Sequence, residues 1–249
     1  MRPYCLKSLA AASLLAAAGI AMTSAGMAVT SLSAADDIFQ QSRAVYAALH
    51  SYSDTGVLDI EYATSRERHT FTTRFKAPRR FYFDFRKSGG DRFAIWSDGE
   101  KFHDWWRSTG VQNDYQQGRG VSAFNQAGYL TLGSGLKIPA LLFPGAGLQG
   151  AFTNLDGIVP DGEEDVDGRR CYRLVGTTKD VYTGTGREVN VRQMTVWVDA
   201  ETLLIRKVFE DAPKGTAVAA VMRITTRYEP QANPALDDNS FQFVSSASK

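Results

Sequence analysis

The sequence predicts a mainly β domain: an antiparallel meander of strands with one helix before it and an apolar insertion in its middle. The clearest strand is RRFYFDFRK, residues 79–87, which places Phe81, Phe83 and Phe85 on every second position. This is the period of a β-strand with one apolar face and one wet face. The question it raises is whether these rings fill a core or line a cavity.

Two further observations support the same fold class. Asp98-Gly99 is a two-residue hairpin signal, Asp167-Gly168 makes a second turn between strand-like runs, and strands joined by hairpins form antiparallel sheets. Over residues 116–154 the strand period gives way to many glycines, few charges and apolar clusters. We therefore expect one or two short helices there, with Pro139 in the first turn of a helix that Pro144 ends.

The first 35 residues have the pattern of a signal peptide. A basic start is followed by an uncharged run rich in Ala, Ser and Gly, and small residues crowd SLSAADD. Cleavage after Ala34 or Ala35 would satisfy the small-residue rule. The alternative is an uncleaved membrane anchor, although Ala, Ser and Gly insert weakly compared with Leu or Phe. We expect a periplasmic protein with residues 1–35 removed and residues 36–249 as one domain.

Charge and cysteine content argue against a nucleic-acid-binding protein and against a disulfide-bonded one. Removing Arg2 and Lys7 from the 28 basic residues leaves 26 against 27 acidic ones, a net charge of −1. There is no basic run of five or six residues, so a nucleic-acid partner is not expected. Cys5 lies in the signal, and Cys171 is then alone in the mature chain, so an internal disulfide is excluded.

The remaining elements follow in order. The stretch DDIFQQSRAVYAALHSY predicts an amphipathic helix capped by Asp36 or Asp37, and its apolar face is Ile38, Val45, Leu49 and Tyr52, with Phe39 beside them. Strand alternation then covers residues 56–62 and 68–78, where Pro78 ends the second strand. After the insertion, strand patterns occupy residues 166–176, 192–210 as a hairpin around Asp199–Thr202, and 217–230. No linker or internal repeat divides them.

These pieces resemble the lipoprotein-localisation-factor superfamily, the LolA/LolB-like proteins. FKAPRRFYFDF followed by IWSDGEKFHDW looks like the family's paired strands and Asp-Gly turn, and MTVWVDAETLLIRKVF looks like its later hairpin. EDVDGRRCYRLVG looks like the strand after the insertion, and NPALDDNSFQFV resembles the usual ending. The resemblance spans nearly all of residues 36–249 and is closest to uncharacterised periplasmic members. No residue matches the carrier's functional arginine, so none is carried over.

The resemblance implies a strongly curved, unclosed antiparallel half-barrel with an apolar cavity on its concave side and helices as a lid. The implied cavity wall is Leu58, Ile60, Phe71, Phe75, Phe81, Phe83 and Phe85. The implied lid is Leu136, Ile138, Leu141, Leu142 and Phe143, bracketed by glycines that would let a short helix move. The alternatives are a solid core without a cavity, which is the usual role of an aromatic stripe, and a helix that is simply packed on the sheet.

An active site has little support. The histidines are His50, His69 and His103, and neither a Gly-x-Ser-x-Gly elbow nor a His-Glu-x-x-His helix is present. Residues 161–168, DGEEDVDG, do not have the spacing of a calcium loop and read as a solvated acidic turn. Cys171 reads as a small apolar filler. We expect no enzyme activity, no cofactor and no bound metal.

The sequence therefore favours a periplasmic carrier or binding protein that shelters a lipid, an acyl chain or an acylated protein. It would be a monomer with transient membrane contact and an envelope protein as donor or acceptor. The alternative is a protein-interaction or sensing module of the envelope whose concave face is filled by its own side chains. A bound amphiphile is needed only for the first function.

Overall fold

The computed structural model describes residues 34–115, 120–148, 150–181, 189–211 and 221–244, all in the compact unit that covers Leu32–Lys249. The helices are α1 (Ala34–Ala48), α2 (Gly120–Leu130) and α3 (Ser134–Leu142), with a short 3₁₀ helix η1 (Asp238–Phe241). The strands before the insertion are β1 (Ser51–Tyr62), β2 (Arg66–Lys76), β3 (Arg80–Arg86), β4 (Arg92–Asp98), β5 (Phe102–Trp106) and β6 (Gln112–Tyr115). Those after it are β7 (Leu155–Val166), β8 (Arg169–Val181), β9 (Val189–Asp199), β10 (Ile205–Asp211), β11 (Val221–Tyr228) and β12 (Gln231–Ala232).

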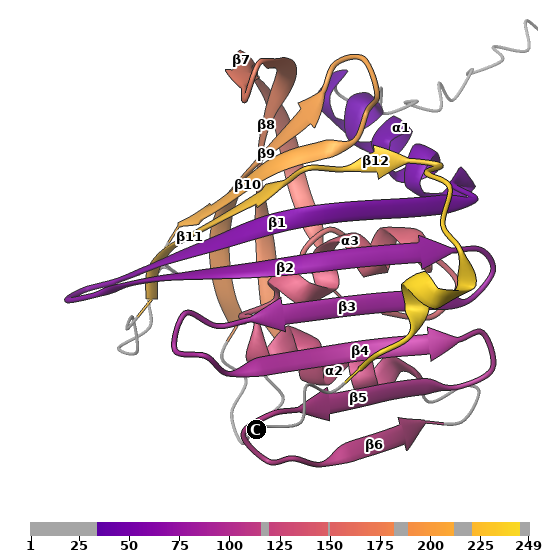
Figure 1. Ribbon diagram of the computed structural model, residues 1–249. Coiled ribbons are helices and arrows are strands. Elements are labelled where there is room, and N and C mark those ends of the chain that lie inside the picture. The colour runs from indigo at the N-terminus through magenta and orange to yellow at the C-terminus, as the bar shows by residue number, and fades with distance from the viewer. Residues whose placement is uncertain (1–33, 116–119, 149, 182–188, 212–220, 245–249) are drawn as a thin grey trace, which may run out of the picture. The chain divides into compact units, whose positions relative to one another are not determined.

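Within the described residues, twelve strands form one antiparallel sheet that does not close (Figure 1). Its order is β6-β5-β4-β3-β2-β1-β11-β10-β9-β8-β7, with β12 beside the start of β1. Each neighbour is the next strand in the chain except at the centre, where β1 pairs with β11. The chain thus builds two wings of hairpins that join in the middle. The predicted mainly β half-barrel with a few helices is confirmed.

The helical insertion connects the two free edges of the sheet. The chain leaves β6 at one edge, forms α2 and α3, and enters β7 at the other edge. Figure 1 shows α2 and α3 behind β2–β5, on the side toward which the second wing turns. The predicted position of Pro139 is wrong, because α3 begins at Ser134 and Pro139 lies inside it. The proline costs the helix the N–H bond that this position would make to the Gly135 carbonyl, and its own carbonyl accepts the Phe143 N–H at the end of the helix.

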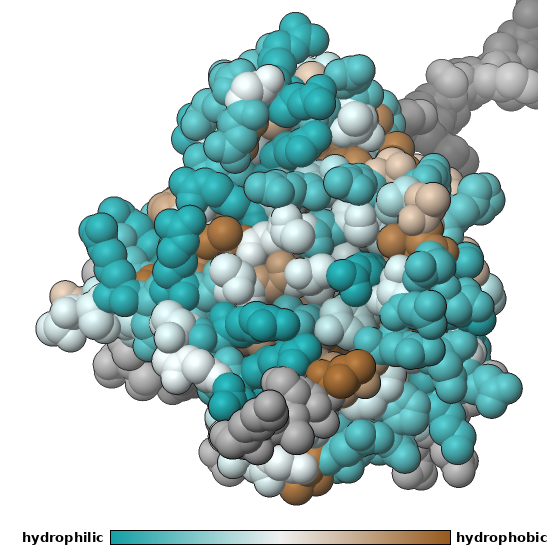
Figure 2. Space-filling model, viewed as in Figure 1, coloured by the Kyte–Doolittle hydropathy of each residue, from teal (hydrophilic) through white to brown (hydrophobic). Residues whose placement is uncertain are grey.

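The outer face of the sheet is largely hydrophilic (Figure 2). The outer face of β3 is an exception to the wet face predicted for it, because Tyr82 and Asp84 are both buried. Asp84 is held by Arg92, with Nε at 2.7 Å from Oδ1 and Nη2 at 2.9 Å from Oδ2. This ion pair supplies the partner that a buried carboxylate needs.

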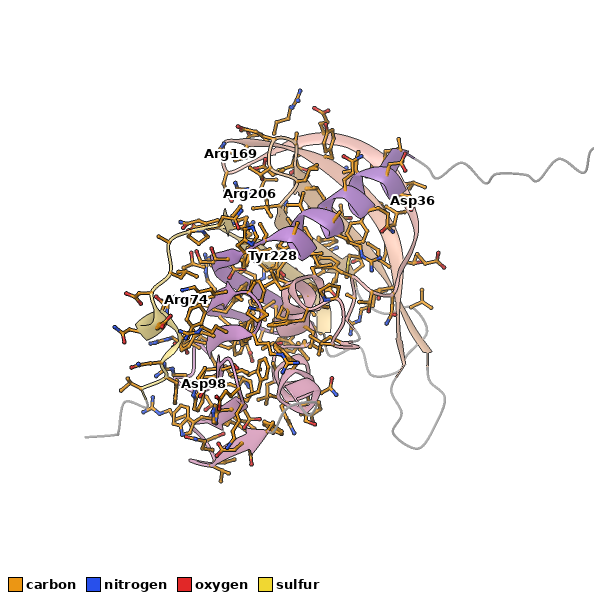
Figure 3. The ribbon with its side chains drawn as sticks, turned by 90° about the vertical axis from the view of Figure 1, so that its right-hand side faces the viewer. Asp36, Arg74, Asp98, Arg169, Arg206 and Tyr228 are labelled. Carbon is orange, nitrogen blue, oxygen red and sulfur yellow. The ribbon has the colours of Figure 1, made fainter. Side chains whose placement is uncertain are left out.

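The C-terminal segment 233–244 lies over this part of the outer face. Arg74 Nη1 donates to the Ser240 carbonyl at 3.0 Å, and the labelled Arg74 lies beside this segment in Figure 3. Phe243 stacks on Trp96 with ring centroids 4.5 Å apart, and the Arg92 guanidinium lies 4.9 Å from the Phe243 ring centroid. The segment therefore covers the outer surface of β2–β5 and encloses the Asp84–Arg92 pair.

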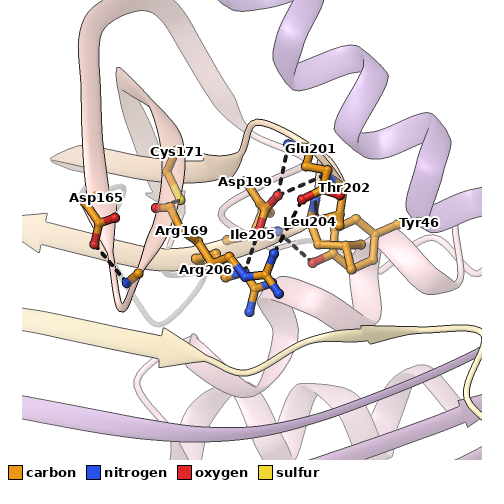
Figure 4. Close-up of polar contacts among 11 residues, drawn as sticks. Tyr46, Asp165, Arg169, Cys171, Asp199, Glu201, Thr202, Leu204, Ile205 and Arg206 are labelled. Carbon is orange, nitrogen blue, oxygen red and sulfur yellow. Dashed lines mark hydrogen bonds and ion pairs between the residues drawn. The ribbon is translucent and has the colours of Figure 1, made fainter.

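Helix α1 packs against β7, β9 and α3. It begins at Ala34, earlier than predicted, so Asp36 and Asp37 lie in its first turn. There their negative charges interact favourably with the helix dipole. Its most buried residues are Ala35, Phe39, Ser42 and Tyr46, whereas the predicted Tyr52 belongs to β1. Tyr46 Oη accepts a hydrogen bond from the Ile205 N–H at 3.0 Å, beside the Asp199 turn (Figure 4).

The turns follow the sequence signals with one difference. Asp167 and Gly168 both have positive φ, 53° and 79°, and form the predicted two-residue hairpin between Val166 and Arg169. The predicted hairpin at Asp199 is also present, with the carboxylate accepting from the Glu201 and Thr202 N–H groups. The Asp98-Gly99 turn is instead a four-residue loop, since Ser97 pairs with Phe102. No helix within the described ranges is long and apolar enough to span a bilayer.

Candidate functional site: a cavity at the open end of the half-barrel

The phenylalanine stripe lies on the inner face of the sheet and is packed. All seven residues of the predicted cavity wall are at most 6% exposed, and they belong to one hydrophobic cluster: Leu58, Ile60, Phe71, Phe75, Phe81, Phe83 and Phe85. Phe81 contacts Phe124 of α2, with ring centroids 5.0 Å apart, and Phe143 after α3 at 5.6 Å. Aromatic rings at these separations are in direct contact. Most of the stripe therefore faces helices.

Helix α3 lies directly on this stripe. All nine of its residues are buried, including the predicted Leu136, Ile138, Leu141 and Leu142, and Phe143 follows half-buried. A Cβ atom placed on Gly135 would lie only 3.2 Å from Phe83 Cζ. The missing side chain therefore lets the backbone of α3 approach the Phe83 ring closely. In this structure α3 is a central helix packed between the two wings; its movement as a lid stays a prediction.

A cavity of about 1410 Å³ opens beside this core, at the end of the sheet where the β1–β2, β3–β4 and β5–β6 turns gather. Its apolar wall is Ile60, Leu130, Leu132, Leu136 and Leu155. Both wings contribute to it, because Ile60 lies near the end of β1 on one side and Leu155 begins β7 on the other. Of the twelve predicted wall and lid residues, Ile60 and Leu136 line this cavity. The others lie in the packed core.

One residue of the cavity wall, Glu210, belongs to a buried ion pair that the sequence analysis did not find. Lys137 is 0% exposed, and its Nζ lies 2.8 Å from Oε2 of Glu210, which lines the cavity from β10. Lys137 Nζ also donates to Ser134 Oγ at 3.2 Å. A single lysine within an apolar helix is normally predicted to point into solvent. The sequence does show Lys137 as the one charged residue in the apolar stretch SGLKIPALL, which suggests a buried and paired lysine, but it does not identify the partner.

Other polar groups surround the mouth of the cavity with both signs of charge. Lys87 and Arg192 are cationic, and Glu67 and Asp156 are anionic. His69, 3% exposed, has its pKa lowered by burial, so neutral imidazole is favoured. Its Nδ1 accepts from the Ser88 N–H at 3.2 Å, which places the proton on Nε2, 3.0 Å from Glu67 Oε2. The mixed lining has no dominant charge.

The remaining candidate groups for chemistry lie apart from one another. His103 is on the outer face, stacked on Trp96 and bonded to Asp114, while His50 is exposed after α1. Cys171 is buried with Val166 and Trp197, and burial raises the pKa of its thiol to about 11. Residues 161–168 are exposed except for Val166, but they end β7 and turn into β8 instead of forming an isolated loop. Within the described ranges, no three His, Cys, Asp or Glu side chains are grouped to hold a metal ion.

Comparisons with known proteins give distant similarities. No protein-family model matches the chain, and no curated protein matches it. Among solved structures, the Mycobacterium tuberculosis lipoprotein LppX is 14% identical, with 81% of this chain and 96% of that one covered and a TM-score of 0.45. MucB in the Pseudomonas aeruginosa MucA/MucB complex is 13% identical, with 84% and 60% covered and a TM-score of 0.44.

A LolA superfamily protein from Nitrosomonas europaea is also among the similar structures. It is 11% identical, with 84% of this chain and 97% of that one covered and a TM-score of 0.35.

Proposed function

We propose that this chain is a non-enzymatic binding or carrier protein of the cell envelope that holds a lipid or acyl chain in the cavity at the open end of its half-barrel. The observation that supports this function is the cavity of about 1410 Å³, in which a leucine and isoleucine wall lies beside polar and charged groups of both signs. Ligand pockets commonly combine an apolar wall, which buries the ligand, with polar groups that fix its orientation.

The physical basis is burial of hydrocarbon. Each CH₂ group removed from water contributes about 0.8 kcal/mol, so an acyl chain laid along Ile60, Leu136 and Leu155 binds without any charged contact. The polar head would lie near the mouth, where Lys87 and Asp156 offer partners of both signs. The packed stripe need not open for this mode of binding, because the cavity lies beside it.

The expected location is the periplasm, after removal of residues 1–35, with an envelope protein or the membrane as donor and acceptor. The apolar N-terminal run followed by small residues supports this location. Native mass spectrometry of protein recovered from the periplasm tests for cargo directly. A bound amphiphile of defined mass supports the carrier function.

A cavity-filling variant tests the site itself. Asn125 is exposed on α2 and lines the cavity, whereas its neighbour Gln126 is equally exposed and does not. We expect Asn125→Trp to weaken binding of a fluorescent fatty-acid probe at least about fivefold, because the indole occupies ligand space. Gln126→Trp is the matched control and should bind the probe like wild type. Equal affinity in all three proteins would contradict the proposed site.

A second function, a protein-interaction or sensing module, is favoured by one specific observation. The rings of the stripe are covered by α2, α3 and Phe143, so most of the concave face is filled by the chain itself. Absence of both bound lipid and probe binding would select this function over the first.

A further inference from the structure

Two exposed apolar side chains stand at the mouth of the cavity. Tyr129, near the end of α2, is 78% exposed, and Leu132, in the turn between α2 and α3, is 37% exposed. Both also line the cavity. Large apolar side chains that are exposed together beside a pocket commonly mark a contact surface.

The turn holds Leu132 in a strained conformation. Its φ is +51°, in the left-handed region that a leucine rarely adopts. Thr131 fixes the turn: its Oγ1 donates to the Ala127 carbonyl at 2.6 Å and accepts from the Gly135 N–H at 2.7 Å. The Gly133 N–H adds a bond of 2.7 Å to the Gly128 carbonyl. The chain thus has an exposed leucine at position 132, although asparagine adopts this backbone conformation more readily and is better solvated.

We infer that the mouth of the cavity docks on a lipid bilayer, with Leu132 and Tyr129 inserted at its surface. This inference rests on the proposed function, because it supplies the route by which an acyl chain passes between a membrane and the cavity. A bilayer fits the mouth better than a protein partner does. Two projecting side chains are too few for a stable protein interface, which buries about 1,000 Å² or more, but tyrosine and leucine suit shallow, reversible insertion.

The charges at the mouth set the kind of membrane. The cations Lys87 and Arg192 and the anions Glu67 and Asp156 place both signs of charge around the opening. Binding should therefore not require anionic lipid and should change little with salt, unlike the binding of a polybasic surface. Zwitterionic phosphatidylcholine vesicles are the suitable probe.

The experiment is flotation of the purified, host-processed protein with phosphatidylcholine vesicles. We expect wild type to float with the vesicles and Leu132→Asn to bind about tenfold more weakly, because the inserted side chain is lost. Leu132→Asn should melt no lower than wild type, since asparagine tolerates positive φ. This separates docking from folding. Tyr129→Ser, at an exposed helix position, should weaken binding in the same direction.

Val159 provides the matched control. It is 52% exposed and lines a separate groove of about 460 Å³ on the outer face of β7–β10. Val159→Thr should float like wild type. Equal loss of binding in Val159→Thr and Leu132→Asn would overturn the inference, and so would absence of wild-type flotation. If wild type does not float but still binds the fatty-acid probe in solution, the docking inference is wrong and the carrier function stands. If wild type floats and binds no probe, the carrier function alone fails.

Discussion

Asp54 is a carboxyl group enclosed by the inner face of the sheet. It is 3% exposed and accepts two hydrogen bonds, from Tyr52 Oη to Oδ2 at 2.7 Å and from the Thr73 N–H to Oδ1 at 3.1 Å. Burial raises its pKa from 3.8 to about 6, and the two hydrogen bonds only partly oppose this rise. The folded state therefore favours the protonated carboxyl group.

This shift predicts a pH dependence of stability. Because the pKa is higher in the folded state than in the unfolded chain, the stabilising contribution is complete below pH about 4 and is lost as pH rises through about 6. The shift corresponds to about 3 kcal/mol between the two charge states. We expect Asp54→Asn to remove this dependence and to raise the free energy of unfolding at pH 7 by about 1 to 3 kcal/mol.

Urea unfolding of wild type and Asp54→Asn at several pH values between 4 and 7 measures the effect. The asparagine keeps an acceptor for the Thr73 N–H, and its amide can donate to Tyr52 Oη once that hydroxyl rotates. Asp59→Asn, on the opposite face of β1, controls for the loss of a carboxylate. Parallel stability curves for wild type and Asp54→Asn would show that Asp54 does not titrate in this range.

At the scale of elements, the Lys137–Glu210 ion pair fixes α3 to β10. Both side chains are buried, and the ion-pair distance is 2.8 Å. Removing one partner leaves the other charge buried without compensation, which typically costs about 3 to 5 kcal/mol. We expect Lys137→Met to lower the free energy of unfolding by this amount. The double variant Lys137→Met/Glu210→Leu should recover most of it, because no buried charge remains. Urea unfolding of the three proteins measures both effects.

The double variant is what makes this prediction specific. A single variant can lose stability merely because methionine packs poorly at position 137. Loss that the second substitution does not relieve would mean that packing, and not the unpaired Glu210 carboxylate, accounts for it. Recovery would also show that α3 needs no charge to stay in the concave face.

The elements whose pattern is local were predictable from the sequence. Alternation gave the strands around Phe81–Phe85, and positive-φ turn chemistry gave the hairpin at Asp167-Gly168, because both depend on residues within one element. The insertion was recognised by its glycines and apolar clusters. The curved, unclosed sheet came from the family resemblance, since no local pattern encodes the pairing of β1 with β11.

The parts that depend on distant segments were not predictable. Tyr82 and Asp84 read as a wet face, but the C-terminal segment and Arg92 cover them. The partner of Lys137 lies 73 positions away, at Glu210 on β10, and a single sequence gives no sign of such a pair. For the same reason the aromatic stripe could not be divided into packed rings and cavity wall. That division depends on where α3 lies between the two wings.

At the scale of the whole molecule, the site of processing must leave α1 in place from about Asp36 onward. This helix begins at Ala34, and Ala35 is fully buried in the main hydrophobic cluster. A cut after Ala34 or Ala35 would remove at most these two small residues and leave Asp36 and Asp37 in the first turn. There their negative charges interact favourably with the helix dipole and offset the positive α-amino group.

We therefore predict that the periplasmic protein begins within a residue or two of Asp36 and keeps the rest of α1. Intact mass and N-terminal sequencing of the periplasmic fraction measure this. A cut several residues further along would remove Phe39, whose ring lies 5.7 Å from that of Phe152, and should expose the core that α1 covers. Protein that retains Met1 and fractionates with membranes would contradict cleavage and favour an uncleaved anchor instead.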